Sequence, residues 1–190
     1  MRSGRRYRQG AGQQGFTLLE VLVAILLVAI GVFGFAKMQA LAMSSTQVAN
    51  SRSIVAVQAS SLAAAMHGNR AYWAAGVAPA TFSTSGATVT DSTGVLNATV
   101  STCKATAKPT SPLCSPAQLA AWDLQTWATN LAGLLPTSRS TVACSTSTNA
   151  PISCVLTVSW TEKYVASTRA AASDSAATGG TRSYTLYIEP

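Results

Sequence analysis

The chain has 190 residues, a mass of 19.5 kDa and a formal net charge of +7, yet only 10% of its residues are charged and 48% are apolar. This balance argues against a wholly disordered chain, which combines low hydrophobicity with high net charge. It also argues against a nucleic-acid-binding protein, because much of the positive charge lies in a short N-terminal tail that contains Arg2, Arg5, Arg6 and Arg8.

The N-terminus has the pattern of a targeting segment. Residues 1–15 are polar and basic, and residues 16–36 form an apolar segment whose single charge is Glu20. A helix of this length spans about 30 Å, which is the thickness of the hydrocarbon core of a bilayer. The arginines before the segment predict a cytoplasmic N-terminus. Residues 37–190 are then expected on the other side of the membrane.

Three interpretations of this segment compete. It is a secretory signal peptide cleaved near Ala40-Leu41-Ala42, a plain signal anchor, or a helix that is retained after cleavage between Gly15 and Phe16. Glu20 favours the third, because a carboxylate inside an apolar segment costs about 2.5–3.5 kcal/mol on insertion scales. A disposable signal has no use for that charge, whereas a retained helix has one if the charge finds a partner.

Cleavage after Gly15 creates such a partner. The new α-amino group of Phe16 lies four residues from Glu20, and opposite charges 4 Å apart attract by about 4 kcal/mol at an effective dielectric constant of about 20. The amine belongs either to the same chain or to a neighbouring copy. In the second case Glu20 aligns helices that stack side by side.

The string GFTLLE at residues 15–20, followed by VLVAILLVAIG, resembles the class III signal of type IV pilins and pseudopilins. The resemblance implies that a prepilin peptidase cuts after Gly15 and N-methylates Phe16. It also implies that Glu20 supports docking of the subunit into a helical filament. The first proline is Pro79, so the apolar helix lacks the proline often found in major pilins.

Three longer stretches are similar to the PilV family of minor pilins, which take part in type IV pilus assembly. They are EVLVAILLVAIGVFGFAKMQALAMSS, AQLAAWDLQTWATNLAGLLP and VLTVSW. The first is also close to minor pseudopilins of type II secretion, and the other two favour the pilus.

Residues 37–70 are expected to continue the apolar segment as an amphipathic helix. Apolar residues recur at steps of three or four positions or their multiples, namely Met38, Leu41, Val48, Val55, Ala59, Leu62 and Met66. The sequence therefore predicts one helix from about residue 16 to residue 70. Its second half requires a packing partner, which residues 71–190 supply.

Residues 71–190 are long enough to bury a core and are expected to form the head domain. Residues 74–94 are expected to form a loop that contains at most a weak strand, and residues 95–100 are a candidate strand. Ser115-Pro116 is expected to begin a helix that stops at Pro136, with an apolar stripe made of Leu124, Trp127, Leu131 and Leu134.

Two further segments alternate between apolar and polar residues. They are residues 152–160, and the C-terminal stretch that contains Tyr184, Leu186 and Ile188. This period predicts half-buried antiparallel strands. The expected fold class is a pilin-like α+β fold, in which a long N-terminal transmembrane and amphipathic helix packs on an antiparallel β-sheet with one additional helix.

The four cysteines are Cys103, Cys114, Cys144 and Cys154, and all follow the apolar segment. Beyond a bacterial inner membrane they lie in an oxidising compartment, so an even number favours disulfides. Three connectivities are possible, and we favour the short-range pairs Cys103–Cys114 and Cys144–Cys154. Zinc binding is the alternative, but the chain has no C-x-x-C motif and a single histidine.

No residue pattern points to catalysis or to a cofactor. The chain lacks a G-x-S-x-G motif, a P-loop and a pair of acidic residues at catalytic spacing. His67 is expected on the surface, Glu162 is expected to pair with Lys163, and Trp122, Trp127 and Trp160 are expected in the core. We therefore expect neither an enzyme nor a metal protein.

The sequence and the resemblance together predict a minor pilin, anchored in the inner membrane by a single helix with its head in the periplasm, and later part of a pilus. The expected partners are other minor pilins, the major pilin, prepilin peptidase and the inner-membrane assembly platform. Two alternatives are a minor pseudopilin of a type II secretion system and a pilus-tip adhesion module.

Overall fold

The computed structural model describes residues 15–100, 103, 114–146, 150–162 and 180–190. It forms two compact units, Met1–Ala42 and Met43–Pro190. The helices are α1 (Leu18–Gly68), α2 (Arg70–Trp73) and α3 (Pro116–Leu134). The strands are β1 (Thr81–Ser85), β2 (Thr88–Asp91), β3 (Arg139–Cys144), β4 (Cys154–Glu162) and β5 (Gly180–Ile188).

Helix α1 contains the two segments expected to be helical, but it is slightly shorter than predicted. It begins at Leu18, and beyond Gly68 the chain re-forms a single helical turn as α2. Buried α1 residues occur only in its second half, at Ser44, Val55, Ala59, Leu62 and Met66. The last four follow one another at steps of four, three and four residues, which places them on one face of the helix, as expected for a helix that packs along one side. Met38 was expected on this stripe but is exposed.

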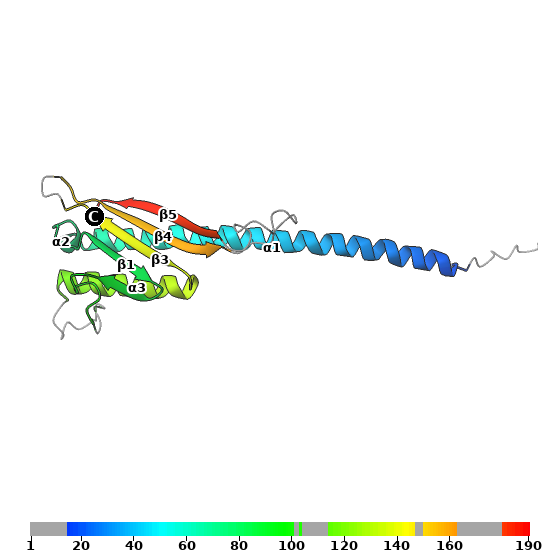
Figure 1. Cartoon of the computed structure of the whole chain (residues 1–190), viewed down its shortest axis with the longest axis horizontal. Coiled ribbons are helices and arrows are strands. Elements are labelled where there is room, and N and C mark those ends of the chain that lie inside the picture. Colours follow the sequence, from blue (N-terminus) through cyan, green and yellow to red (C-terminus); the bar gives the residue numbers. More distant parts are fainter. Residues whose placement is uncertain (1–14, 101–102, 104–113, 147–149, 163–179) are drawn as a thin grey trace, which may run out of the picture. The chain divides into compact units, whose positions relative to one another are not determined.

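The five strands form one antiparallel sheet with the order β2-β1-β3-β4-β5 (Figure 1). Buried and exposed side chains alternate along each of the first four strands, so one face of the sheet is packed and the other faces solvent. The alternation predicted for residues 152–160 is confirmed from Cys154 onward in β4, which begins two residues later than predicted, and the C-terminal strand is confirmed as β5.

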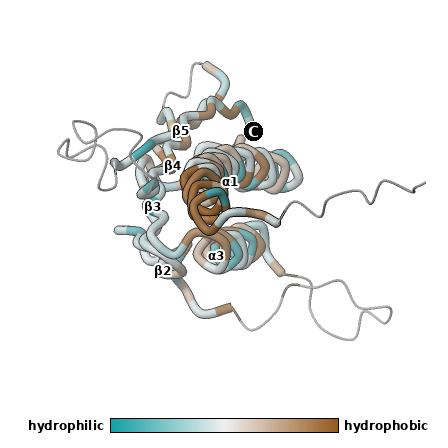
Figure 2. The backbone as a smooth tube through the Cα atoms, turned by 90° about the vertical axis from the view of Figure 1, so that its right-hand side faces the viewer, coloured by the Kyte–Doolittle hydropathy of each residue, from teal (hydrophilic) through white to brown (hydrophobic). Residues whose placement is uncertain are grey.

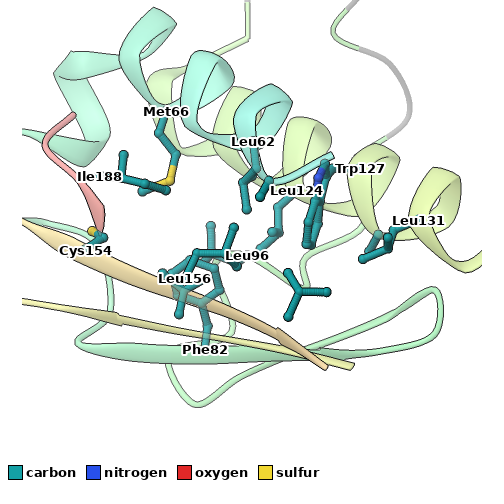
Figure 3. Packing of buried hydrophobic residues seen from close by; sticks show 14 of the residues in the cluster. Leu62, Met66, Phe82, Leu96, Leu124, Trp127, Leu131, Cys154, Leu156 and Ile188 are labelled. Carbon is teal, nitrogen blue, oxygen red and sulfur yellow. The ribbon is translucent and has the colours of Figure 1, made fainter. Parts of the chain in front are cut away.

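The core of the head lies between the packed face of the sheet and two helices. Leu62 and Met66 of α1 and Leu124 of α3 lie in one cluster with strand residues, of which Figure 3 labels Phe82, Leu156 and Ile188. Val142 and Val158 belong to the same cluster. The two helices are also joined by a hydrogen bond, because the indole Nε1 of Trp127 donates to the carbonyl of Gln58 at 2.8 Å. The predicted α+β architecture, a long helix packed on an antiparallel sheet with an additional helix, is confirmed.

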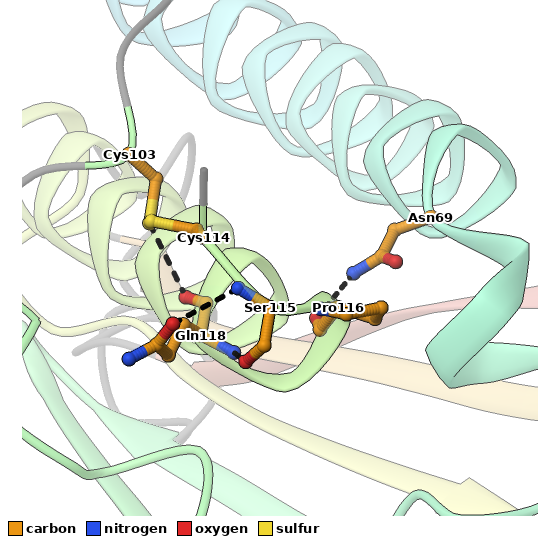
Figure 4. The surroundings of a disulfide bond; sticks show 6 residues. All are labelled: Asn69, Cys103, Cys114, Ser115, Pro116 and Gln118. Atoms are coloured by element: carbon orange, nitrogen blue, oxygen red, sulfur yellow. Dashed lines mark hydrogen bonds between the residues drawn. A yellow bond between two sulfur atoms is a disulfide. The ribbon is translucent and has the colours of Figure 1, made fainter. Parts of the chain in front are cut away.

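Helix α3 starts where the sequence places its cap. The Ser115 hydroxyl accepts the backbone N–H of Gln118, and the Gln118 side chain accepts the N–H of Ser115 (Figure 4). This reciprocal pair satisfies two backbone donors that a helix start otherwise leaves free. The side chain of Asn69 donates to the carbonyl of Pro116 at 2.7 Å and ties the start of α2 to the start of α3. Leu134, expected on the apolar stripe, is 51% exposed.

The prediction of a strand at residues 95–100 was wrong. These residues form turns, and the strands lie earlier, as the hairpin β1–β2 within a segment that looked like a loop. The physical cause is Asp91, whose carboxylate accepts the backbone N–H groups of Thr93, Val95 and Leu96. Those N–H groups are therefore bound to a side chain instead of a neighbouring strand. Leu96 is nonetheless fully buried, because the turn folds it into the core.

The cysteines form two disulfides, Cys103–Cys114 and Cys144–Cys154. The first closes the segment that leads into α3 (Figure 4). The second links residues that are directly opposite each other on β3 and β4. No thiol of the four remains free for a metal.

Candidate processing and assembly site

The peptide bond between Gly15 and Phe16 lies just before helix α1. Residues 15–17 are not helical, and the Phe16 side chain is 81% exposed. A Cβ atom added at Gly15 would meet no atom within 4 Å. The bond is therefore in accessible, non-helical backbone, which is the form in which a protease binds its substrate.

Thr17 caps the start of α1. Its hydroxyl accepts the backbone N–H of Glu20 at 3.2 Å, and its carbonyl accepts the N–H of Val21 at 3.3 Å. The order Thr-x-x-Glu is the sequence signature of a helix start. The hydrogen bond from its backbone N–H to Thr17 places Glu20 in the first turn of α1. A carboxylate in the first turn is stabilised by the positive end of the helix dipole.

The carboxylate of Glu20 is exposed and makes no hydrogen bond or ion pair among the residues that the structure describes. It is followed by an apolar surface that runs around the whole helix, with Leu22, Ile25, Leu26 and Phe33 all at least 60% exposed. Figure 2 shows this part of α1 as the most hydrophobic stretch of the chain. A helix that is apolar all round requires lipid or packed neighbours.

In length and composition, α1 qualifies as a membrane-spanning helix, and it is the only helix in the described ranges that does. Its apolar half and the signal-like sequence before it indicate membrane anchoring.

The head contains a charge cluster, built around one buried carboxylate, that the sequence did not reveal. Glu162, with a side chain that is 3% exposed, accepts two hydrogen bonds from Arg52 of α1, at 3.0 and 3.1 Å. Nε of Arg182 lies 3.5 Å from Oε2 of Glu162. The indole N–H of Trp160 donates to Oε1 of the same carboxylate at 3.2 Å. The hydrogen bonds from Arg52 hold the pKa of Glu162 below its usual value, although burial opposes them.

No sequence signal indicates this cluster, because Arg52 and Glu162 are 110 positions apart. The pair between Glu162 and Lys163 was expected because the two residues are adjacent in the sequence. Lys163 lies outside the described residues. The cluster ties α1 to the end of β4 and is part of the head's framework.

The other candidate residues belong to the head. His67 is exposed at the end of α1, Trp127 and Trp160 are buried, and Trp122 is partly buried. Within the described ranges, no three His, Cys, Asp or Glu residues come together in a way that would hold a metal ion.

Comparison with known families finds one match. Residues 10–36 match the model of the prokaryotic N-terminal methylation motif. This range includes Gly15, Phe16, Thr17 and Glu20 and supports a relationship to the type IV pilin-like family. No curated protein and no solved structure matches the chain.

Proposed function

We propose that the protein is a minor pilin, a non-enzymatic subunit that takes part in the assembly of a type IV pilus. The observation that carries this proposal is the methylation motif at residues 10–36. The motif coincides with an accessible Gly15–Phe16 bond, a capped helix start and an unpaired carboxylate at Glu20 within the described part of the chain.

Each part of the segment has a physical role in this proposal. Residues 1–15 are a leader that prepilin peptidase removes, and Phe16 becomes the N-methylated first residue. Residues 16–36 hold the subunit in the inner membrane and later pack in the filament, where neighbouring helices cover their apolar surface. Glu20 pairs with the terminal amine of a neighbouring copy and sets the register between subunits.

The head, residues 71–190 together with the end of α1, selects the neighbours in this proposal. Its partners are other minor pilins and the major pilin, and the inner-membrane assembly platform receives the subunit before extrusion. The assignment to PilV-like minor pilins rests on the similarity of residues 117–136 and 155–160 to that family. In the membrane the N-terminus is cytoplasmic and the head is periplasmic.

The proposal is tested first by the N-terminus of the protein isolated from native membranes. Mass spectrometry of the intact chain should show N-methylated Phe16 as the first residue. Gly15→Val should abolish cleavage, because the peptidase is expected to require glycine at this position. A Cβ atom at residue 15 meets no atom within 4 Å, so a clash of that atom within the protein would not explain the loss. Gly34→Val, also without atoms within 4 Å, is the matched control and should be cut normally. A chain that starts near Met43, or one that retains Met1, contradicts the proposal.

A second experiment separates the pilus from the pseudopilus of type II secretion. Deletion of the gene should abolish twitching motility and surface pili while secretion of type II substrates continues. Loss of type II secretion with intact twitching and surface pili would instead identify a minor pseudopilin, which has the same N-terminal signal and the same need for Glu20.

A further inference from the structure

The solvent face of the sheet consists mostly of hydroxyl side chains. In each strand the buried side chains point toward the helices, and the side chains between them point outward to solvent. Most of these outward positions are Ser or Thr, namely Thr81, Ser83, Ser85, Thr88, Thr90, Thr141, Thr157, Ser159, Thr161, Thr181, Ser183 and Thr185. Both α1 and α3 pack on the opposite face, so no described helix covers this surface.

The strand register brings nine of these hydroxyls into two rows, the second of which also contains Arg139. The first hydroxyl row crosses all five strands through directly paired residues, in the order Thr90, Ser83, Thr141, Thr157 and Thr185. The second hydroxyl row lies two residues along each strand and consists of Thr88, Ser85, Arg139, Ser159 and Ser183. Neighbouring strands are about 4.8 Å apart, so each row is about 19 Å long.

Strand propensity accounts for only part of this composition. Threonine is favoured in strands because it is β-branched, but serine is not among the residues enriched there. Serines nevertheless occupy row positions on β1, β4 and β5, at Ser83, Ser85, Ser159 and Ser183. The face is also almost uncharged, with Arg139 as its only charged side chain among the described strand residues.

The hydroxyls of the rows keep most of their hydrogen-bonding capacity. The Thr157 and Thr185 hydroxyls lie 3.5 Å apart, and Ser159 donates to the carbonyl of Arg139 at 3.4 Å. Within the described part of the chain the other row hydroxyls have no partner. Each one is able to donate one hydrogen bond and accept two.

Two further features lie on the same face. A shallow hollow of about 250 Å³ opens over the β2–β1–β3 end of the rows, lined in part by Thr81, Ser83, Thr90 and Thr141. At the other edge Tyr187, two residues after Thr185, is 77% exposed. Its ring offers a flat apolar surface with a polar tip.

We propose that this face binds a neutral polysaccharide. A sugar polymer repeats hydroxyls that both donate and accept, which matches the two rows, and the C–H face of a pyranose ring fits against an exposed aromatic ring such as Tyr187. The lack of charge argues against nucleic acid or an anionic membrane, because both require clustered Lys and Arg. A protein partner is disfavoured because serine is depleted in protein interfaces, where Arg and several aromatic residues are enriched.

The proposal concerns the sheet alone and does not depend on the filament assignment. The full chain in detergent micelles is incubated with cellulose particles, chitin particles and heparin beads, and the retained fraction is measured. Retention on cellulose or chitin and not on heparin is the expected result. Thr141→Val/Thr157→Val removes two central hydroxyls while keeping β-branched side chains, and should weaken binding about tenfold.

The matched control is Thr126→Val/Thr129→Val, which makes the same change on α3. It should bind as the unmodified chain does, and all variants should keep the same unfolding midpoint. Tyr187→Ala should also weaken retention, which separates a sugar site from a general effect of hydroxyl loss. The proposal is overturned if neither neutral polymer retains the chain, if heparin alone retains it, or if the row variant and the control bind equally.

Discussion

The carboxylate of Glu20 is the only charge within residues 16–36. If it pairs with the amine of a neighbouring subunit, Glu20→Gln should leave cleavage and methylation unchanged, because the cut bond lies outside the helix. Assembly should fall at least about tenfold, since an ion pair in a low-dielectric setting is worth more than the roughly 1.4 kcal/mol that corresponds to that factor. Surface filaments and processed protein are measured by immunoblot of sheared and membrane fractions.

Glu189→Gln is the control for that prediction, because Glu189 is an exposed carboxylate at the end of the head. It should assemble normally. Normal assembly of the Glu20→Gln variant would show that Glu20 has no part in register.

Asp91 gives the head a predictable dependence on pH. Burial tends to raise its pKa, but the hydrogen bonds from Leu96, Thr93 and Val95 outweigh burial and hold the pKa below its ordinary value. Glu162 is shifted in the same direction by Arg52. Their stabilising contribution is complete above the unfolded values of about 4 and is lost as pH falls through the lower folded values. The contribution of these two carboxylates to the free energy of unfolding should therefore be constant from pH 7 to about 5 and decline below about 4.

Asp91→Asn isolates this effect. Since the carboxylate accepts three backbone N–H groups and the Thr93 hydroxyl, the variant should lose about 1–3 kcal/mol at pH 7. That difference should shrink as pH approaches 3, in denaturant titrations at each pH. Asp123→Asn is the contrasting control, because burial raises the pKa of Asp123 and its charge therefore opposes folding. An equal deficit for Asp91→Asn at pH 7 and pH 3 would contradict the assignment.

At the residue scale, a local sequence pattern could be recognised before the structure was known, and long-range pairing could not. Gly15, Phe16 and Glu20 stand out because their pattern lies within six consecutive residues. Arg52 and Glu162 have no such pattern, because only the packing of α1 against the end of β4 brings them together. Asp91 was missed for a related reason: its role depends on where the chain turns after β2.

Among the elements, α3 provides the sharpest test of a cap. Ser115→Ala removes the hydroxyl that accepts the N–H of Gln118 and should cost about 1 kcal/mol of stability. The unfolding midpoint, followed by circular dichroism, should fall by a few degrees. Ser61→Ala, at an exposed serine within α1, should leave the midpoint nearly unchanged. A midpoint equal to that of the unmodified chain would mean that Ser115 does not cap α3.

The helices were better predicted than the strands. Helix α3 has both a cap signal and an apolar stripe, strand β4 alternates over its nine residues, and strand β5 alternates over Tyr184–Ile188. The hairpin β1–β2 has strands of five and four residues made largely of Ser and Thr, so its sequence looks like a loop. For residues 95–100 a strand was predicted where none forms. Their apolar residues resemble a strand, but the Asp91 side chain holds the backbone of Val95 and Leu96 in turns.

For the whole molecule, the division after Ala42 predicts an independent head. A chain of residues 43–190 contains all the buried hydrophobic residues of the core cluster and both disulfides. It should be soluble without detergent and unfold in one cooperative transition, measured by calorimetry. A chain that starts at Ala63 is the comparison: it lacks Val55, Ala59 and Leu62, and should not fold. Broad, non-cooperative unfolding of residues 43–190 would contradict the division.

The residues that form the head core lie far apart in the sequence, and this separation has a consequence for folding during synthesis. Arg52 and the apolar stripe of α1 are synthesised early, but Glu162 follows 110 positions after Arg52, and Ile188 follows later still. Contacts of such high sequence separation form slowly, because the intervening chain must close as a loop first. Until β4 and β5 are made, Leu62 and Met66 therefore lack part of the core that covers them. If the head folds in the periplasm as proposed, a holdase there that binds this stripe should raise the yield of folded heads.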